Sequence, residues 1–154
     1  MYVLPFGLNG DKPVPADFSG DGKAEIAVWR PSEGRWYVGN IATGGFGTYD
    51  WGLNGDMPVV GDFSGDGKAD YAVYRPSNQT WYRVHTDTFS VVEKQFGVSG
   101  DIPAPGDFDG DGKLDIAVYR PTEGRWYVWT ATSTPLSQLF GLNGDVPTES
   151  AFVF

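Results

Sequence analysis

Short apolar runs alternate with glycine-rich polar loops along the whole chain. In the best-defined stretch, the apolar or aromatic runs are 59–63, 70–75 and 81–85, followed by a more polar segment at 91–96. The apolar residues of 70–75 occupy both faces, as in a strand buried on both sides, and the polar segment is expected at the outer edge of the sheet. No ten-residue stretch has apolar residues at the 3.6-residue helical period. The pattern therefore predicts an all-β chain with four short strands in this stretch.

The same pattern recurs every 45 residues, which is the first sign of a repeat architecture. Asp17, Asp62 and Asp107 are 45 residues apart, and aromatic–Gly pairs begin at residues 6, 51, 96 and 140. We therefore interpret the chain as a single repeat domain, residues 1–154. Its units cover approximately 7–51, 52–96 and 97–140, with end fragments at 1–6 and 141–154.

The end fragments fit the same register. Residues 2–7 align with the outermost strand of a preceding unit, and residues 146–154 align with the innermost strand of a following unit. Ala151 stands where the third unit has Asp107, so no fourth acidic loop is expected. The chain is therefore expected to add partial strands at both ends.

Four antiparallel strands in about 45 residues is the size of a β-propeller blade. The composition agrees, because 22 Gly, 11 Pro and many aromatic residues suit short strands joined by turns. A β-trefoil, which also has three units of about this length, is the alternative. Three blades are fewer than a closed propeller needs. We therefore expect either a homo-oligomer or missing blades supplied by a parent chain.

Each unit contains a nine-residue acidic loop. In the third unit this loop is 107–115, with carboxylates at its first, third, fifth and ninth positions and Gly112 after the third carboxylate. Alternate residues of a tight loop can point their oxygens into one hollow, which is the coordination that Ca²⁺ requires. The alternative is an Asp-Gly turn held by hydrogen bonds between side chains and backbone, without metal.

The net charge of −9 is concentrated in these loops. They contain 10 of the 20 acidic side chains, so three bound Ca²⁺ ions would reduce the net charge to −3. Much of the acidity is therefore interpreted as metal ligand. No basic stripe is present that could neutralise phosphates, so nucleic acid is not expected as a partner.

The aromatic–Gly start, the Asp-x-[Asp/Ser]-x-Asp-Gly-x-x-[Asp/Glu] loop and the Arg-Pro step make each unit resemble the FG-GAP repeat of integrin-type propellers. The resemblance covers nearly the whole chain and implies a propeller, up to three structural Ca²⁺ ions and an extracellular or cell-surface location. It implies that the metal loop lies between the first and second strands of a blade. The implied ligands are Asp17, Ser19, Asp21, Lys23 and Glu25; Asp62, Ser64, Asp66, Lys68 and Asp70; and Asp107, Asp109, Asp111, Lys113 and Asp115, the lysines through backbone oxygens. Ser19 and Ser64 replace a carboxylate, so the first two sites are expected to be weaker than the third.

Aromatic and arginine residues also recur in every unit. As a ligand site they would stack on sugar rings and donate hydrogen bonds to hydroxyl groups. As structural residues the aromatics would fill the space between blades, with Arg stacked on Trp, and identical recurrence in each unit favours this second interpretation. The residues concerned are Trp29, Arg30, Trp36, Tyr74, Arg75, Trp81, Tyr119, Arg120 and Trp126.

The remaining features give little support to catalysis. The sequence has no Cys and no Ser–His–Asp spacing, and its one histidine, His85, is expected at the surface. Neither a signal peptide nor a membrane span is visible, so no membrane insertion is expected. The sequence therefore predicts a non-enzymatic, calcium-stabilised extracellular binding module. Its ligand could be a glycan, as in a lectin; the alternative is a protein-interaction or structural propeller module within a larger secreted protein.

Overall fold

All regular structure is β in the computed structural model, which describes residues 5–41, 43–131 and 135–148. Three antiparallel sheets of four strands each are present, and the described residues contain no helix. The first sheet contains β1 (Lys12–Pro13), β2 (Ile26–Arg30), β3 (Arg35–Gly39) and β4 (Phe46–Asp50). The second contains β5 (Met57–Gly61), β6 (Asp70–Arg75), β7 (Thr80–Val84) and β8 (Val91–Gln95). The third contains β9 (Ile102–Pro103), β10 (Ile116–Arg120), β11 (Arg125–Trp129) and β12 (Leu136–Leu139).

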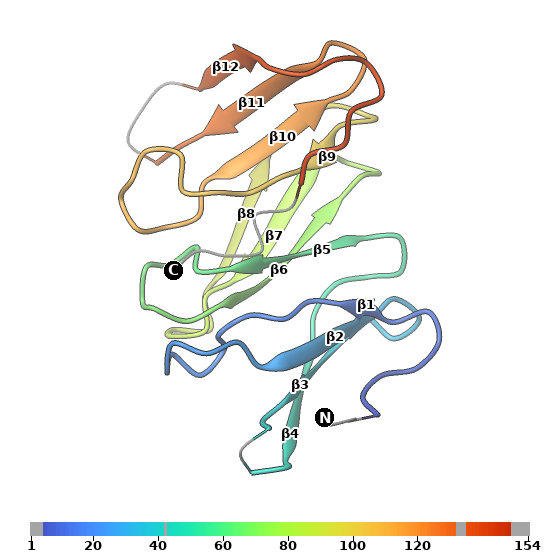
Figure 1. The fold of residues 1–154 in the computed structure, drawn as a ribbon, viewed down its shortest axis with the longest axis vertical. Coiled ribbons are helices and arrows are strands. Elements are labelled where there is room, and N and C mark those ends of the chain that lie inside the picture. Colours follow the sequence, from blue (N-terminus) through green and yellow to red (C-terminus); the bar gives the residue numbers. More distant parts are fainter. Residues whose placement is uncertain (1–4, 42, 132–134, 149–154) are drawn as a thin grey trace.

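Each sheet is a meander in which consecutive strands pair, so that the order in the second sheet is β5-β6-β7-β8. The three sheets follow one another along the molecule and do not close into a ring (Figure 1). This arrangement is consistent with propeller blades and confirms the predicted all-β class. The β-trefoil alternative is wrong, because each unit forms a sheet of its own rather than part of a shared barrel.

The innermost strand is longer in the second blade than in the other two. β5 runs for five residues, with Val60 opposite Tyr71, whereas β1 and β9 have two residues each. Pro15 and Pro105 occupy the position of Val60. Proline has no N–H to donate to the ladder, so regular pairing is interrupted there. Pairing resumes in the first and third blades as single bridges at Ala16 and Gly106.

The core lies between neighbouring blades rather than inside one sheet. One cluster joins the first and second blades around Trp29, Trp36 and Val73. A second joins the second and third blades around Tyr74, Trp81 and Val118. Large aromatic side chains fill the gap between sheets, and such residues bury the greatest apolar area per position. The stability of each blade therefore depends on the blade beside it.

The predicted partial strands at the ends are not formed in the described residues. Residues 5–7 and 141–148 have no strand assignment. The remaining positions of these predicted strands, including Ala151, lie outside the described residues. Among the residues that the structure describes, no helix is long and apolar enough to cross a membrane.

Candidate metal centre

The acidic loops connect the first and second strands of each blade, as the family resemblance implies. Each loop is closed by antiparallel pairing of the residue before its first carboxylate with its ninth residue. These pairs are Ala16 with Glu25, Gly61 with Asp70 and Gly106 with Asp115. The hairpin therefore brings the first and ninth positions of each loop to the same end.

The first aspartate organises the backbone of each loop. In the first loop, Asp17 Oδ1 accepts the N–H of Gly20 at 2.6 Å and Oδ2 accepts that of Gly22 at 2.7 Å. Asp62 and Asp107 accept the N–H groups of the matching glycines in the second and third loops. Positive φ angles at Gly20 and Gly22, of 79° and 82°, let the chain wrap around this carboxylate.

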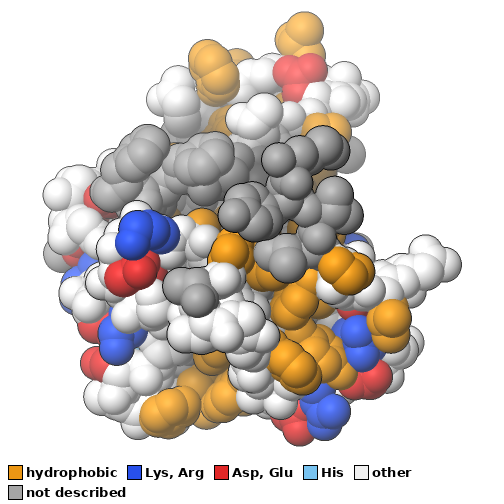
Figure 2. All heavy atoms as spheres, turned by 60° about the horizontal axis from the view of Figure 1, so that its bottom comes forward, with side chains coloured by type: hydrophobic (Ala, Val, Ile, Leu, Met, Phe, Trp, Pro, Cys, Tyr) orange, Lys and Arg blue, Asp and Glu red, His pale blue; other side chains and the backbone are white. Residues whose placement is uncertain are grey.

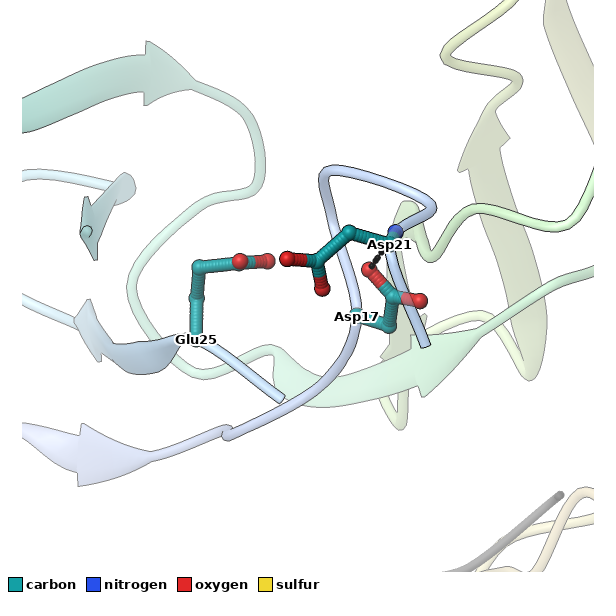
Figure 3. Close-up of side chains that lie close together, drawn as sticks. All are labelled: Asp17, Asp21 and Glu25. Carbon is teal, nitrogen blue, oxygen red and sulfur yellow. Dashed lines mark hydrogen bonds between the residues drawn. The ribbon is translucent and has the colours of Figure 1, made fainter. Parts of the chain in front are cut away.

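The first loop brings three carboxylates together (Figure 3). One oxygen from each of Asp17, Asp21 and Glu25 lies within 4.8 Å of the other two. The hydroxyl of Ser19 lies between the first and last of them, 3.3 Å from Asp17 Oδ1 and 3.1 Å from Glu25 Oε1. Four oxygen-bearing side chains therefore surround one small space, as a hard cation requires.

The third loop forms a similar group from different positions. Asp107, Asp109 and Asp115 each place one carboxylate oxygen within 4.8 Å of the others. Asp111 is not in this group, and its Oδ1 accepts the N–H of Lys113 at 2.9 Å. The third loop has Asp109 where the first has Ser19, so the loop as a whole carries one more acidic side chain, although each converging group contains three carboxylates.

The second loop differs, although its sequence closely matches that of the first. Among the described residues, grouping within 4.8 Å occurs only in the first and third loops. Asp70 is fully buried, and its Oδ1 accepts the N–H and hydroxyl of Thr86, at 2.8 and 3.3 Å. Its Oδ2 accepts the N–H groups of Phe63 and Ser64. Both oxygens of Asp70 are therefore committed to protein donors.

Two basic side chains lie near Asp70 in this blade alone. Arg83 and His85 both interact electrostatically with Asp70. The first and third blades have Val38 and Val128 where the second has Arg83. Within the described part of the chain, Arg83 Nε and His85 Nε2 are buried without a hydrogen-bond partner. His85, which was expected at the surface, is half-buried. The positive charge of Arg83 near Asp70 opposes a cation in this loop.

The pKa directions reflect the same environments. Burial raises the pKa of Asp17, but hydrogen bonds from the N–H groups of Gly22, Gly20 and Asp21 together lower it by more. The pKa of Asp17 is therefore lowered overall. Burial raises the pKa of Asp115, and the negative charges of Asp109 and Asp111 raise it as well. Burial also raises the pKa of Asp70. In the third loop the carboxylates repel one another, so a bound cation would stabilise the charged form of Asp115.

The lysine side chains of the loops do not enter these groups. Lys23 Nζ lies 3.5 Å from Asp21, and both side chains are exposed. The Lys68 side chain lies over Gly20 of the first loop, and that of Lys113 lies over Gly65 of the second. Lys68 and Lys113 therefore each reach from their own blade to the preceding one.

The recurring aromatic residues lie mainly in the core. Trp29, Trp36 and Trp81 have no exposed surface, and Tyr74 and Tyr119 are almost completely buried. Indole N–H groups bond to backbone carbonyls, as from Trp81 to Phe96 O at 3.3 Å. Trp126, in the third blade, is half-buried. These positions support the packing interpretation of the repeated aromatics.

The recurring arginines form a structural contact that was not predicted from the sequence. Each arginine forms a bidentate ion pair with the aspartate at the start of the same blade. Each guanidinium also lies over a tyrosine ring, at 4.2–4.3 Å from its centroid. The expected stacking on Trp is therefore wrong. The triads are Arg30, Asp11 and Tyr37; Arg75, Asp56 and Tyr82; and Arg120, Asp101 and Tyr127.

The donor sets of the first and third loops fit Ca²⁺. Both supply several oxygens, most of them anionic, from irregular loops, which suits a large cation that accepts irregular coordination. Nitrogen and sulfur donors are absent from both groups, which argues against zinc. An ion in the first loop would be held by Asp17, Asp21 and Glu25, and one in the third by Asp107, Asp109 and Asp115.

Comparison with known proteins agrees with the repeat structure. The profile of the FG-GAP-like repeat matches twice, over residues 17–73 and 62–118. A search of curated proteins gives no match. The fold is similar to that of a catalytically inactive H270A virginiamycin B lyase from Staphylococcus aureus, crystallised with quinupristin. The TM-score is 0.52 at 12% identity, and the alignment covers 86% of this chain but only 43% of the lyase. Because the repeat profile matches most of its length, the chain belongs to the FG-GAP-like repeat family.

Proposed function

We propose that this chain is a calcium-stabilised, non-enzymatic interaction module that works outside the cell. FG-GAP-like repeats suggest a propeller-type interaction module, and proteins with such repeats are often extracellular. The ions would be structural: each would neutralise a group of like charges and fix the hairpin between the first and second strands. The loops contain no helix that a bound ion could move, so the sites are not proposed as calcium sensors.

One observation supports this proposal above the others. Oxygens of Asp17, Asp21 and Glu25 lie within 4.8 Å of one another, although like charges repel. Asp107, Asp109 and Asp115 make a second group of the same kind. Loops as exposed as these suit the weak sites of extracellular modules, with a Kd of about 10⁻⁴–10⁻³ M. We therefore propose two principal Ca²⁺ sites, with weak or no binding at the second loop.

Glycan binding through the repeated Trp and Arg residues is the finer alternative, and the structure gives it little support. The indoles of the first two blades are buried, and each arginine is engaged with an aspartate and a tyrosine. Neither group is free to meet a sugar without opening the core. We therefore favour protein interaction or a structural role, and we expect a glycan array probed with calcium-loaded protein to give no signal.

A matched pair of variants tests the metal proposal. Asp21→Asn and Asp66→Asn are the same substitution at the same loop position, and each aspartate accepts the N–H of the following lysine at 2.9 Å. The local structural cost should therefore be similar in both. Only Asp21 belongs to a converging group. The stabilisation by Ca²⁺ should fall in Asp21→Asn and remain in Asp66→Asn.

Thermal unfolding with chelator and with Ca²⁺ is the measurement. When the free Ca²⁺ concentration is 100 times the Kd of a site, binding stabilises the fold by about 2.7 kcal/mol. Wild type and Asp66→Asn should therefore unfold at clearly higher temperature with Ca²⁺ than with chelator. Equal responses of the two variants would show that the first loop is not a calcium site.

A further inference from the structure

Adjacent acidic loops are joined across the blade boundary by one repeated backbone hydrogen bond. The N–H of Ala69 in the second loop donates to the C=O of Asp17 in the first, at 2.7 Å. The N–H of Leu114 in the third loop donates to the C=O of Asp62 in the second, also at 2.7 Å. The eighth position of each loop therefore binds the first position of the preceding loop.

Two side-chain contacts accompany this bond at both boundaries. A Cβ placed on Gly20 would lie 3.0 Å from Cγ of Lys68, and one placed on Gly65 would lie 2.6 Å from Cε of Lys113. The loop phenylalanine packs against the following blade as well: Phe18 stacks on Tyr71 with ring centroids 5.2 Å apart, and Phe63 shares a core cluster with Ile116. A blade boundary therefore has a defined donor side and a defined acceptor side.

The first blade presents an unused donor side. Within the described ranges, the N–H of Ala24, the eighth position of its loop, makes no backbone hydrogen bond. Lys23 has a side chain that is 82% exposed. Ile26 is only half-buried, whereas Ile116 at the matching position is buried. Figure 2 turns the end of the molecule that carries this blade toward the viewer, and hydrophobic side chains gather on part of the face shown.

The third blade presents the complementary acceptor side. In the part of the chain that the structure describes, the C=O of Asp107 accepts no backbone hydrogen bond. No atom lies within 4 Å of a Cβ placed on Gly110, the position that Lys68 and Lys113 cover in the other loops. Phe108 is 46% exposed, whereas Phe63 at the matching position is 5% exposed.

We propose that these two sides bind each other between two copies of this chain, head to tail. The Ala24 N–H of one copy would donate to the Asp107 C=O of the other, Lys23 would lie over Gly110, and Phe108 would pack against Ile26. Each contact repeats one that already joins blades within the chain, so the interface continues an existing one. The inference goes beyond the proposed function, because none of these three contacts requires a bound ion.

A second copy is the occupant that the observations favour, because the same chain carries both complementary sides. Such a contact is heterologous and forms a ring if its rotation closes. The aligned part takes up 43% of the similar lyase chain, so two copies together approach the length of that chain.

Paired cysteine variants test the contact directly, since the chain has no cysteine of its own. At the boundary of the second and third blades, Leu114 Cδ1 lies directly against the place of a Cβ on Gly61, so these two positions face each other. The equivalent positions on the two unused sides are Ala24 and Gly106. Ala16 occupies the position of Gly106 in the first blade. At Gly106 a Cβ would lie 3.0 Å from Cε2 of Phe108, so this half-exposed ring has to shift slightly.

Chains carrying Ala24→Cys and chains carrying Gly106→Cys should be mixed and oxidised, or joined with a short bismaleimide. We expect a crosslinked dimer in the mixture only, with neither variant crosslinking to itself. Crosslinks formed equally well by one variant alone would indicate a two-fold symmetric contact and overturn the proposal. The absence of any crosslink in the mixture, with both variants folded by circular dichroism, would also overturn it.

Light scattering of the wild type at micromolar concentration is the independent measurement. The expected mass is at least twice the 16.8 kDa of one chain. Lys23→Glu should weaken the association at least tenfold, whereas Lys12→Glu, the same charge change in the innermost strand, should leave it unchanged. A stable mass of one chain, or equal effects of both variants, would contradict the proposed contact.

Discussion

Arg75 forms a bidentate ion pair with Asp56, in which Nε donates to Oδ1 at 2.8 Å and Nη2 donates to Oδ2 at 2.9 Å. Asp56 also accepts the N–H of Leu53 at 2.8 Å, which closes the turn that begins the second blade. The Asp56 side chain is 2% exposed. This pair, repeated in all three blades, fixes the start of the innermost strand to the end of the second strand.

Removing one partner of this pair should be costly. Arg75→Met leaves the carboxylate of Asp56 buried without its counter-charge, and breaking a buried pair in this way costs about 3–5 kcal/mol. Arg35→Met is the control, because Arg35 pairs with Asp50 at the surface, where such pairs contribute about 1 kcal/mol or less. Chemical denaturation of both variants measures the loss in free energy of unfolding. Equal losses would show that the buried pair stabilises the fold no more than the surface pair does.

Acid should weaken the same contact in the first blade. Hydrogen bonds from Arg30 lower the pKa of Asp11, although burial raises it. A carboxyl group whose pKa is lowered by folding contributes stability above its unfolded pKa of about 3.9, and this contribution is lost as the pH falls through its folded pKa. In chelator, the wild type should therefore lose stability below about pH 4.

The variant Asp11→Asn separates this contribution from that of the other carboxyl groups. It should be less stable than the wild type near neutral pH, and the difference between the two proteins should shrink below about pH 4. The free energy of unfolding should be measured between pH 2 and pH 7. A difference that stays constant over this range would contradict the assignment to Asp11.

Turn glycines at the blade boundary should not tolerate a side chain. Gly34 has φ = 61°, and a Cβ there would lie close to the backbone oxygen of Gly52. Both the left-handed conformation and the contact oppose Gly34→Ala, which should cost about 1–3 kcal/mol. Gly47→Ala is the control, because nothing lies within 4 Å of its Cβ and its φ is not in the left-handed region. Similar stabilities for the two variants would contradict this assignment.

The contribution of each repeated tryptophan to the free energy of unfolding should depend on how deeply it is buried between blades. Trp36 is fully buried between two blades, so Trp36→Ala should lower the free energy of unfolding by about 3–5 kcal/mol. Trp126 occupies the matching position in the third blade but is half-buried, so Trp126→Ala should cost clearly less. Both indoles donate a hydrogen bond to a backbone carbonyl, which makes the pair well matched. Equal losses would show that burial between blades does not decide the cost.

Much of the fold could be predicted because the sequence pattern of each strand and loop recurs in three units. The predicted run 70–75 is β6 without change, and the predicted 91–96 differs from β8 by one residue. The first strand was placed at 59–63, whereas β5 is Met57–Gly61, because the acidic loop begins as soon as Asp62 turns its side chain to the loop N–H groups. The short β1 and β9 follow from Pro15 and Pro105.

The candidate metal centre was less predictable, because its geometry depends on residues outside the loop. Ser19 and Ser64 suggested that the first and second loops would behave alike. Instead, Thr86 binds Asp70 from the end of the third strand, and Arg83 adds a positive charge nearby. Two sequence signals were present: Arg83 replaces a valine of the other two units, and Thr86 stands where those units have Ile41 and Ala131.

The ion pairs also escaped prediction, since Asp11 and Arg30 are 19 residues apart and their contact depends on strand register. Arginine and aspartate were each visible as repeated residues. Only the pairing of β1 with β2, which sets Lys12 opposite Trp29, brings the two side chains together.

Titration calorimetry with chelator-treated protein counts the bound Ca²⁺ ions and so tests the proposed metal sites. We expect about two principal ions per chain, held by the group around Asp17 and the group around Asp107. Asp21→Asn should reduce this number by one, and Asp66→Asn should not change it. Absence of Ca²⁺ binding by folded protein, together with unfolding that is unchanged by chelator, would contradict the proposed sites.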